Sequence, residues 1–266
     1  MRRNILIYLL PIFLLSCGTA EFSPNQRFNS GSPQNVNATQ IAKLAQKTPG
    51  AVIRIAVSSD THTAYDDSRD FVKYVNSTGG FDFAVLNGDI TNFGLLTEFE
   101  GIEKIYEGLN IPFVTVIGNH DENAEGNSVY QRMFGEKNFT FSYGGIKFIC
   151  HDTNSREHSF DGTAPDMDWL RKNMVPDANH PFLIAFSHVP SFDGDFDPSL
   201  RQPYEQLFNT TSGVLASVHS HRHSTDSIYK PDSTSIPFIV TNTILNRTFT
   251  VIEISNGQLS THPVSF

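Results

Sequence analysis

The residues best suited to take part in a chemical reaction are Gly118, Asn119, His120 and Asp121. They follow residues 112–117, an apolar run rich in β-branched side chains that predicts a buried strand. A glycine, an amide, an imidazole and a carboxylate then replace the apolar side chains, so the chain leaves the sheet and presents polar groups. Open α/β sheets bind ligands at the carboxyl ends of their strands. These residues therefore mark a candidate site, although a polar loop after a strand is common.

Four other strand-like runs end in residues of the same chemical kind. They are Asp60 and His62 after residues 52–57, Asp89 after residues 83–86, His188 after residues 182–186, and His219 and His221 after residues 214–218. Carboxylates and imidazoles that converge on one edge of a sheet are typical ligands of hard to borderline metal ions. Because they are too many for one ion, the sequence predicts a centre with more than one metal.

The elements that must position these residues alternate in the first half of the domain. Residues 67–77 carry apolar side chains at helical spacing, and a capping-box pattern at residues 97–100 opens a second helix. Strand, helix, strand, helix, strand implies parallel pairing and a covered sheet. The second half is more antiparallel, with the following predicted elements: a short helix at 130–134, a hairpin at 139–143 and 146–150, a helix at 167–174, a loop at 191–203, and strands at 237–241, 248–254 and 258–264. Asn256 and Gly257 predict a type I′ turn between the last two strands.

Length and charge limit the class of protein. A chain of 266 residues is long enough for one large α/β domain, which we place at residues 51–266, and it shows no internal repeat. The formal net charge of −9 argues against a protein that binds nucleic acid through its general surface.

The first residues predict export and anchoring. Arg2 and Arg3 precede an apolar run at residues 5–15 that is too short to span a bilayer, which is typical of a secretory signal. The run ends in a pattern that resembles a bacterial lipobox, so residues 1–16 would be a lipoprotein signal peptide and Cys17 the lipidated amino terminus. The alternative is ordinary secretion. Residues 17–50 are then interpreted as a flexible tether, with a short helix favoured at 41–46.

This interpretation places the protein in the bacterial cell envelope, at the outer membrane or facing the periplasm. The membrane is then a partner through the lipid on Cys17. With Cys17 lipidated, Cys150 is the only remaining thiol, and its place in a strand pattern indicates a buried core residue.

In chain order, the motifs read Asp-x-His, Gly-Asp, Gly-Asn-His-Asp, His and His-x-His, from Asp60 to His221. This set resembles the calcineurin-like metallophosphoesterase family, and the single small domain resembles its cyclic-nucleotide-phosphodiesterase-like members. The resemblance implies an α/β fold, a four-layer α/β/β/α sandwich with two mixed sheets in a single domain. It also implies two divalent or mixed-valence metal ions, drawn from Mn, Fe, Zn and Ni, between the strand ends.

The resemblance also implies a role for each residue. The first metal would be held by Asp60, His62 and His221, the second by Asn119, His188 and His219, and Asp89 would bridge both. His120 would bind neither metal and would face the scissile phosphoester. Asp121 would support His120 without contacting the metals or the substrate.

The activity implied is hydrolysis of a phosphoester, a diester or a monoester, by in-line attack of a metal-bridging hydroxide on a small substrate. His120 would stabilise or protonate the leaving alkoxide. A nuclease is disfavoured by the acidic charge and by the absence of a basic aromatic stripe. A non-catalytic metal-binding surface lipoprotein on the same scaffold is the other alternative, which the complete ligand set and the intact His120 disfavour.

Three positions bear on this resemblance. Val218 stands where the family usually has a glycine before the last His-x-His, so His219 could sit differently. His223 is an additional histidine, which we interpret as a residue at the rim of the site. Asn92 stands where a purple acid phosphatase has a tyrosine ligand, which disfavours that subgroup.

Overall fold

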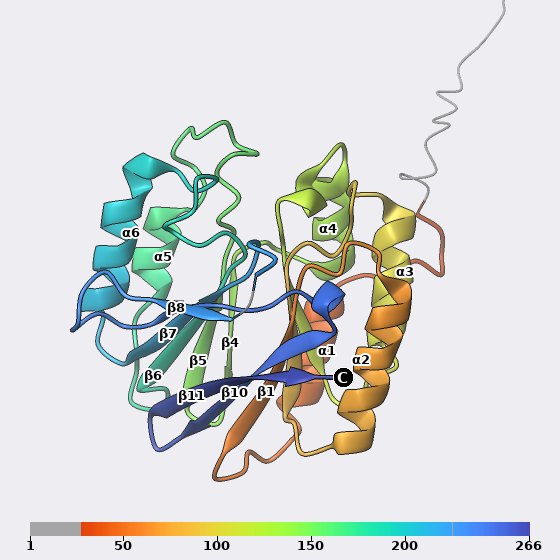
Figure 1. Cartoon of the computed structure of the whole chain (residues 1–266), viewed down its shortest axis with the longest axis horizontal. Coiled ribbons are helices and arrows are strands. Elements are labelled where there is room, and N and C mark those ends of the chain that lie inside the picture. Colours follow the sequence, from red (N-terminus) through yellow and green to blue (C-terminus); the bar gives the residue numbers. More distant parts are fainter. Residues whose placement is uncertain (1–27, 225) are drawn as a thin grey trace, which may run out of the picture.

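Two mixed β-sheets pack face to face, and helices cover both outer faces (Figure 1). The computed structural model describes residues 28–224 and 226–266. Within these residues the layers run helices, sheet, sheet, helices, which confirms the four-layer α/β/β/α sandwich and the single domain that the sequence predicts.

The first sheet has the order β11-β10-β1-β2-β3. Its strands are β1 (Ile53–Ser58), β2 (Phe83–Asn87), β3 (Phe113–Val116), β10 (Thr248–Ser255) and β11 (Gln258–Ser265). β1, β2 and β3 pair in parallel, whereas β10 and β11 add antiparallel strands. Every residue of β2 and β3 is buried, as expected for parallel strands covered on both faces.

The second sheet has the order β4-β5-β6-β7-β9-β8. Its strands are β4 (Phe139–Tyr143), β5 (Ile146–Cys150), β6 (Phe182–Phe186), β7 (Val214–His219), β8 (Ser227–Tyr229) and β9 (Phe238–Val240). The four central strands are parallel, and β4 and β8 are antiparallel edges. The carboxyl ends of β6 and β7 therefore meet at one edge of this sheet, as those of β1, β2 and β3 do in the other.

Helices fall into two groups. Those over the first sheet are α1 (Val36–Leu44), α2 (Tyr65–Thr78), α3 (Leu96–Tyr106) and α4 (Gly126–Phe134). Those over the second are α5 (Met167–Asn173) and α6 (Pro198–Thr210), and two 3₁₀ turns, η1 (His120–Glu122) and η2 (Ile244–Asn246), lie in loops. No helix in the described part of the chain has the length and apolar character needed to cross a membrane.

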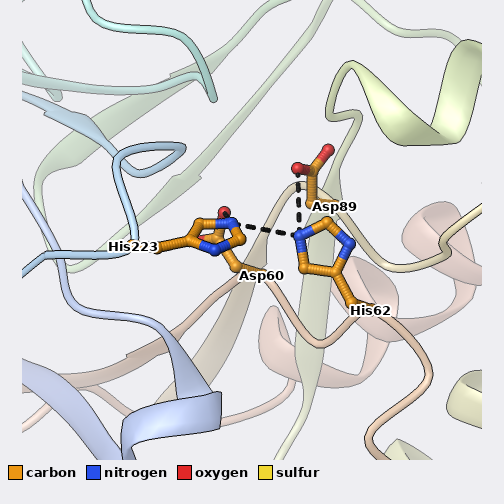
Figure 2. Close-up of side chains that lie close together, drawn as sticks. All are labelled: Asp60, His62, Asp89 and His223. Carbon is orange, nitrogen blue, oxygen red and sulfur yellow. Dashed lines mark hydrogen bonds and ion pairs between the residues drawn. The ribbon is translucent and has the colours of Figure 1, made fainter.

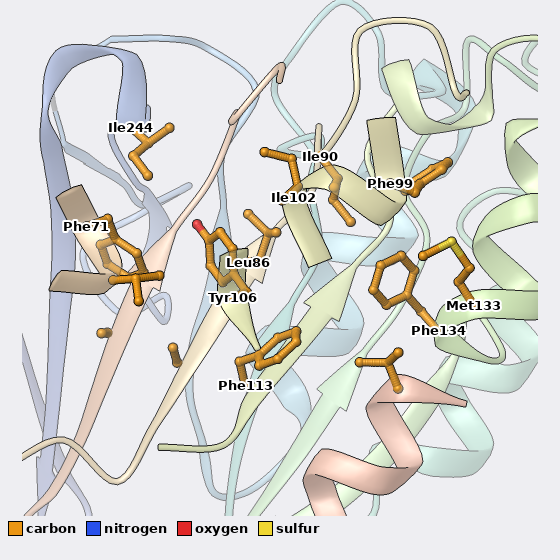
Figure 3. Packing of buried hydrophobic residues seen from close by; sticks show 14 of the residues in the cluster. Phe71, Leu86, Ile90, Phe99, Ile102, Tyr106, Phe113, Met133, Phe134 and Ile244 are labelled. Carbon is orange, nitrogen blue, oxygen red and sulfur yellow. The ribbon is translucent and has the colours of Figure 1, made fainter. Parts of the chain in front are cut away.

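Three apolar cores hold the layers together, one between the sheets and one under each helical layer. Figure 3 shows the core under α2, α3 and α4, where aromatic side chains such as Phe71, Tyr106 and Phe113 fill the space between helix and sheet. Close packing of this kind fixes the strand ends, because even small volume changes in a core are costly. The site residues are thus carried by a rigid frame.

Most predicted elements are confirmed, including the hairpin of β4 and β5 and the final turn, where Asn256 and Gly257 both have positive φ. The predicted loop at residues 191–203 is wrong from residue 198 onward, because α6 begins there. The Asp197 side chain accepts a hydrogen bond from the Ser199 N–H, and Pro198 takes the first helical position. Both are helix-start signals that the sequence contains. Strand β8 was also not predicted.

The tether interpretation of residues 17–50 is wrong for α1. Asn37 is buried, and its side-chain amide donates to the Thr115 carbonyl and accepts from the Thr115 N–H, at 3.0 and 2.8 Å. Because β3 is the edge of its sheet, Asn37 satisfies backbone groups that no strand pairs. The packed structure therefore begins before residue 51. Cys17 and the predicted signal peptide lie outside the described residues.

Candidate metal centre

Polar side chains from five strand ends meet where the carboxyl edges of the two sheets face each other. They come from the loops after β1, β2, β3, β6 and β7. The side chains form two groups of possible metal ligands that share Asp89, and within each group the ligand atoms lie within 4.8 Å of one another.

The first cluster consists of Asp60, His62, Asp89 and His223, which turn toward one another in Figure 2. Nε2 of His62 lies 3.1 Å from Nε2 of His223 and 3.4 Å from Oδ2 of Asp89. Nε2 of His223 lies 3.1 Å from Oδ1 of Asp60. Two imidazole nitrogens and two carboxylate oxygens thus point into one small volume.

The second cluster consists of Asp89, His188 and His221, with Asn119 beside it. Nε2 of His188 lies 3.2 Å from Oδ2 of Asp89, and Nδ1 of His221 lies 3.0 Å from Oδ1 of Asn119. Nδ1 of His188 is 2.9 Å from the Asn87 carbonyl oxygen. Because a carbonyl can only accept, Nδ1 carries a proton, and Nε2 is the nitrogen that faces the site.

The backbone at this edge is strained where it aims these side chains. Five of the cluster residues adopt the left-handed region, with φ between 41° and 72°: Asp60, His62, Asp89, His221 and His223. Non-glycine residues seldom adopt positive φ, and such conformations concentrate at functional sites. The fold therefore accepts a conformational cost to make these side chains converge.

Two glycines supply the room for the ligands. A Cβ on Gly88, which has a φ of 88°, would overlap the imidazole of His188. A Cβ on Gly118 would overlap the backbone and carboxylate of Asp89. The glycines that precede Asp89 and Asn119 are thus required by close approach, and they explain two positions of the sequence motifs.

The residues present fit a pair of metal ions. Oδ2 of Asp60 is buried without a hydrogen-bond partner, which is costly unless a ligand satisfies it. Oδ1 of Asp60 and Nε2 of His188 lie close to His223 and Asp89 but make no hydrogen bond with them. Burial lowers the pKa of His62 and of His221, which favours the neutral imidazole that a metal requires. Burial would also lower the pKa of His188, but the charge of Asp89 raises it to about 10. The carboxylates thus attract a cation to this position.

His219, predicted as a ligand of the second metal, does not reach the site. In β7, Ala216 and Val218 point into the core between the sheets, so His219 points to the opposite, helix-covered face. Its Nδ1 lies 3.0 Å from the Ser187 hydroxyl and its Nε2 2.9 Å from the Ser217 hydroxyl. With both nitrogens bonded, His219 is a structural residue.

The register of the last motif is therefore shifted by two residues. His221, predicted for the first metal, lies in the second cluster, and His223, interpreted as a rim residue, lies in the first. In this register the residue before the His-x-His pair, His221 and His223, is Ser220. Val218 therefore does not occupy the position where the family usually has a glycine. The sequence signal for His223 is that His221 and His223 repeat the separation of His219 and His221, which makes the second pair a candidate equal to the first.

His120 lies beside both clusters without joining either group of ligand atoms. Its Nδ1 is 3.0 Å from the Asn92 carbonyl oxygen, so that nitrogen is the donor and Nε2 is free. Its ring centroid is 4.7 Å from that of His62, and its backbone N–H donates to Oδ1 of Asp89 at 2.9 Å. A half-buried imidazole is thus held next to the two clusters of possible metal ligands.

Asp121 supports this arrangement through the backbone. Its buried carboxylate accepts from the N–H groups of Gly118, Ile90 and Thr91 at 2.9 to 3.1 Å, and from the Thr91 hydroxyl. It therefore ties the loop that carries Asp89 to the loop that carries His120. Burial and the charge of Asp89 raise the pKa of Asp121 to about 7, while the three N–H donors oppose that rise. Asp121 is a positioning residue, not a catalytic one.

A third group of possible ligands has a different character. Glu122, Asp152 and His158 lie together, but Nζ of Lys137 lies 2.6 Å from Asp152 and 3.0 Å from Glu122. Hydrogen bonds to Asp152 and Glu122 raise the pKa of His158 to about 10. Because Lys137 and His158 balance the two carboxylates, this group is an ion-pair cluster that ties the loop after His120 to the loop after β5.

Comparison with known proteins agrees with this geometry. Residues 53–224 match a family model described as calcineurin-like phosphoesterase, which covers all the residues of both clusters. The chain belongs to the calcineurin-like phosphoesterase family. No curated protein matches it in sequence.

Solved structures share the fold of this family member at low identity. GAP50, described as the anchor in the inner membrane complex of Plasmodium, is 15% identical with a TM-score of 0.56, over 80% of this chain and 84% of that one. The purple acid phosphatase PPD1 of yellow lupin (Lupinus luteus) is 13% identical with a TM-score of 0.55, over 82% and 54%. A hypothetical protein of Thermus thermophilus is 12% identical with a TM-score of 0.52, over 80% and 98%. These similarities show the fold alone.

Asn92, on the loop after β2, contacts the loop after β1 in this phosphoesterase. The side-chain amide of Asn92 donates to the His62 carbonyl oxygen and to the Thr63 hydroxyl, both at 2.9 Å. Asn92 thus braces the loop after β1.

Proposed function

We propose that this calcineurin-like phosphoesterase hydrolyses a small phosphoester at a binuclear metal centre. The observation that most directly supports this proposal is that one carboxylate oxygen, Oδ2 of Asp89, lies 3.4 Å from Nε2 of His62 and 3.2 Å from Nε2 of His188. An oxygen placed between two ligand groups is positioned to bridge two ions. The first ion would be held by Asp60, His62, Asp89 and His223, and the second by Asp89, Asn119, His188 and His221.

Two divalent ions bound there would supply an activated water and positive charge for an in-line displacement. Mn, Fe, Zn and Ni all suit this mixture of imidazole and oxygen ligands. The protein itself supplies a rigid frame. Asp89 accepts from the His120 N–H, and Asp121 ties the two loops together, so ligand and imidazole are held at a fixed separation.

His120 is the candidate general acid of the reaction. Because Nδ1 donates to the Asn92 carbonyl, a protonated His120 can give up only the proton on Nε2. That proton would pass to the alkoxide oxygen as the phosphorus–oxygen bond breaks. The neutral imidazole that remains keeps the same hydrogen bond to Asn92, so the ring need not rotate between steps.

The alternative is a non-catalytic metal-binding protein on the same scaffold. That role would require the ligands and place no demand on His120, whose free Nε2 beside the clusters favours catalysis. A nuclease has less support because the chain carries a net charge of −9. Monoester and diester substrates both remain within the proposal.

The test is hydrolysis of an aryl phosphomonoester and an aryl phosphodiester by protein stripped with a chelator and reloaded with Mn, Zn, Ni or Fe. Activity that is lost on chelation and returns with about two ions per chain would support the proposal. Metal binding without turnover of either ester would favour the non-catalytic alternative. Full activity of the stripped protein would contradict a metal-dependent reaction.

We also propose that the protein is anchored in the cell envelope through a lipid on Cys17, a proposal that rests on the lipobox pattern of the sequence. Cys17→Ser should abolish lipid labelling and either release the protein from membranes or leave it uncleaved. Unchanged labelling and membrane partition in that variant would contradict the proposal.

A further inference from the structure

We propose that Asp195, held by Arg156, is a positioning residue that fixes the tautomer of His221 and thereby sets the affinity of the second metal position. This inference rests on the proposed binuclear centre. It concerns residues 193–197, the part of the loop between β6 and α6 that follows His188 and contributes no ligand to either cluster of the proposed centre.

Both ring nitrogens of His221 face oxygen atoms. Nδ1 lies 3.0 Å from Oδ1 of Asn119, on the side of the second cluster, and Nε2 lies 3.1 Å from Oδ2 of Asp195, on the other side. The imidazole is thus clamped between a candidate metal ligand and a carboxylate. Its side chain is 15% exposed and that of Asp195 20%, so water screens this contact only partly.

The chemistry of the imidazole assigns the proton. Nδ1 of His221 can bind an ion together with Oδ1 of Asn119 only if it presents a lone pair, so the proton must lie on Nε2. An ionised carboxylate only accepts hydrogen bonds. Asp195 therefore stabilises the tautomer that binds metal, and its negative charge makes the imidazole a better electron donor.

Asp195 is itself held in place from several directions. Nη1 of Arg156 lies 2.6 Å from Oδ2 of Asp195, and the Arg156 N–H donates to the Asp195 carbonyl at 3.2 Å. The next residue, Phe196, is buried against Tyr204, and Asp197 caps α6. The carboxylate is thus presented to His221 by a loop whose downstream end is anchored in the core.

The neighbouring Asp193 provides an internal comparison. Its Oδ1 lies 3.7 Å from Nε2 of His221, beyond hydrogen-bond distance, and its Oδ2 lies 3.7 Å from Arg222. Asp193, Asp195 and His221 could also be read as a site for a further cation. The guanidinium of Arg156 already pairs with Asp195, so the loop has its positive partner without another ion.

The experiment measures metal affinity at each position. Chelator-stripped wild type, Asp195→Ala, Asp195→Asn and the control Asp193→Ala are titrated with Mn²⁺ in equilibrium dialysis with metal analysis. Outer contacts to a metal-binding histidine are typically worth about 10–100-fold in affinity. We expect Asp195→Ala to weaken one of the two binding steps by that amount while the other step and the Asp193→Ala variant stay close to wild type.

Asp195→Asn keeps the shape and an acceptor oxygen, so it should fall between wild type and Asp195→Ala. Two binding steps of unchanged affinity in Asp195→Ala would overturn the inference and leave the proposed function intact. Equal weakening of both steps, together with a lower unfolding temperature of the stripped protein, would show a merely structural role and also overturn it. Fewer than two ions in the wild type would contradict the binuclear centre itself.

Discussion

Three histidines lie within five residues at the end of β7, and the surroundings of their ring nitrogens differ. His221 and His223 lie among possible metal ligands, whereas His219 lies among hydroxyl groups. His221 and His223 turn toward the two ligand clusters, a region named the crevice from here on, where Nε2 of His223 lies 3.1 Å from Nε2 of His62. These two nitrogens can share a hydrogen bond only if one of them carries a proton, whereas metal binding would require both to present lone pairs. His219 turns to the helix side, where hydroxyl groups of Ser187 and Ser217 satisfy both of its nitrogens.

The difference separates a site from a structural network although both use the same residue type. On the helix side, Tyr204 continues the network, with its hydroxyl 2.9 Å from Nε2 of His151 and 3.4 Å from Ser217. Burial lowers the pKa of His219 to about 3, so it stays neutral in its place. In the crevice, the buried Oδ2 of Asp60 lacks a hydrogen-bond partner. Unsatisfied buried polar atoms indicate a ligand, whereas satisfied ones indicate stability.

The largest effect should come from Asp89→Asn, because Asp89 is common to both clusters of the crevice. We expect occupancy to fall at both metal positions and activity to fall on the order of 10³-fold, since bound metals are worth several kcal/mol to such reactions. His62→Ala should mainly empty one position. The control is Asp197→Asn, which removes a carboxylate outside the crevice and retains a good helix cap. Unchanged metal content in Asp89→Asn would remove the basis of the binuclear assignment.

The next effect concerns His120, which lies in the crevice yet outside both clusters. His120→Ala should retain metal and lose activity by about 10²–10⁴-fold, the usual contribution of a general acid. An alkyl ester should lose more than a nitrophenyl ester, because nitrophenolate leaves without a proton. Equal losses for the two esters would favour phosphate positioning over proton donation.

Much of the fold follows from local pattern. The start of α6 also has local signals, Asp197 and Pro198, whereas α1 depends on a tertiary contact. The runs that became β1, β2, β3 and β6 are apolar because both faces are covered, and such runs are recognisable in a sequence. Helix α1 is different, since Asn37 is stabilised by its pairing with Thr115, 78 residues away. No local pattern contains that contact.

The candidate site was predictable as a set of strand ends, but not in the register of its last motif. His219, His221 and His223 are separated by equal steps, so spacing alone cannot choose between the two possible pairs. The end of the strand makes the choice. His219 still belongs to β7, whereas His221 and His223 follow it and can adopt positive φ, which turns them into the crevice.

Removing one histidine from each environment tests this choice directly. His223→Ala should reduce occupancy at one metal position with little effect on the stability of the stripped protein. His219→Ala should retain both metals and lower the free energy of unfolding by about 1–3 kcal/mol, because Ser187 and Ser217 lose their buried partner. Denaturant unfolding with parallel metal analysis measures both quantities. Loss of metal in His219→Ala at unchanged stability would restore His219 as a ligand and overturn the comparison.

The smallest effect should come from Tyr204→Phe, which removes one hydroxyl from the satisfied network. Nε2 of the buried His151 then loses a partner at 2.9 Å, and the expected cost is about 1 kcal/mol. For a domain of this size that cost lowers the unfolding temperature by about 2–4 °C. Tyr74→Phe removes the same hydroxyl from α2, away from the network, and should change little. Metal affinity and turnover should match wild type in both variants, because Tyr204 contributes no atom to the crevice. A change in metal affinity in Tyr204→Phe would show that the helix-side network and the crevice are coupled through β7, and the two sets of histidines would then form one functional unit.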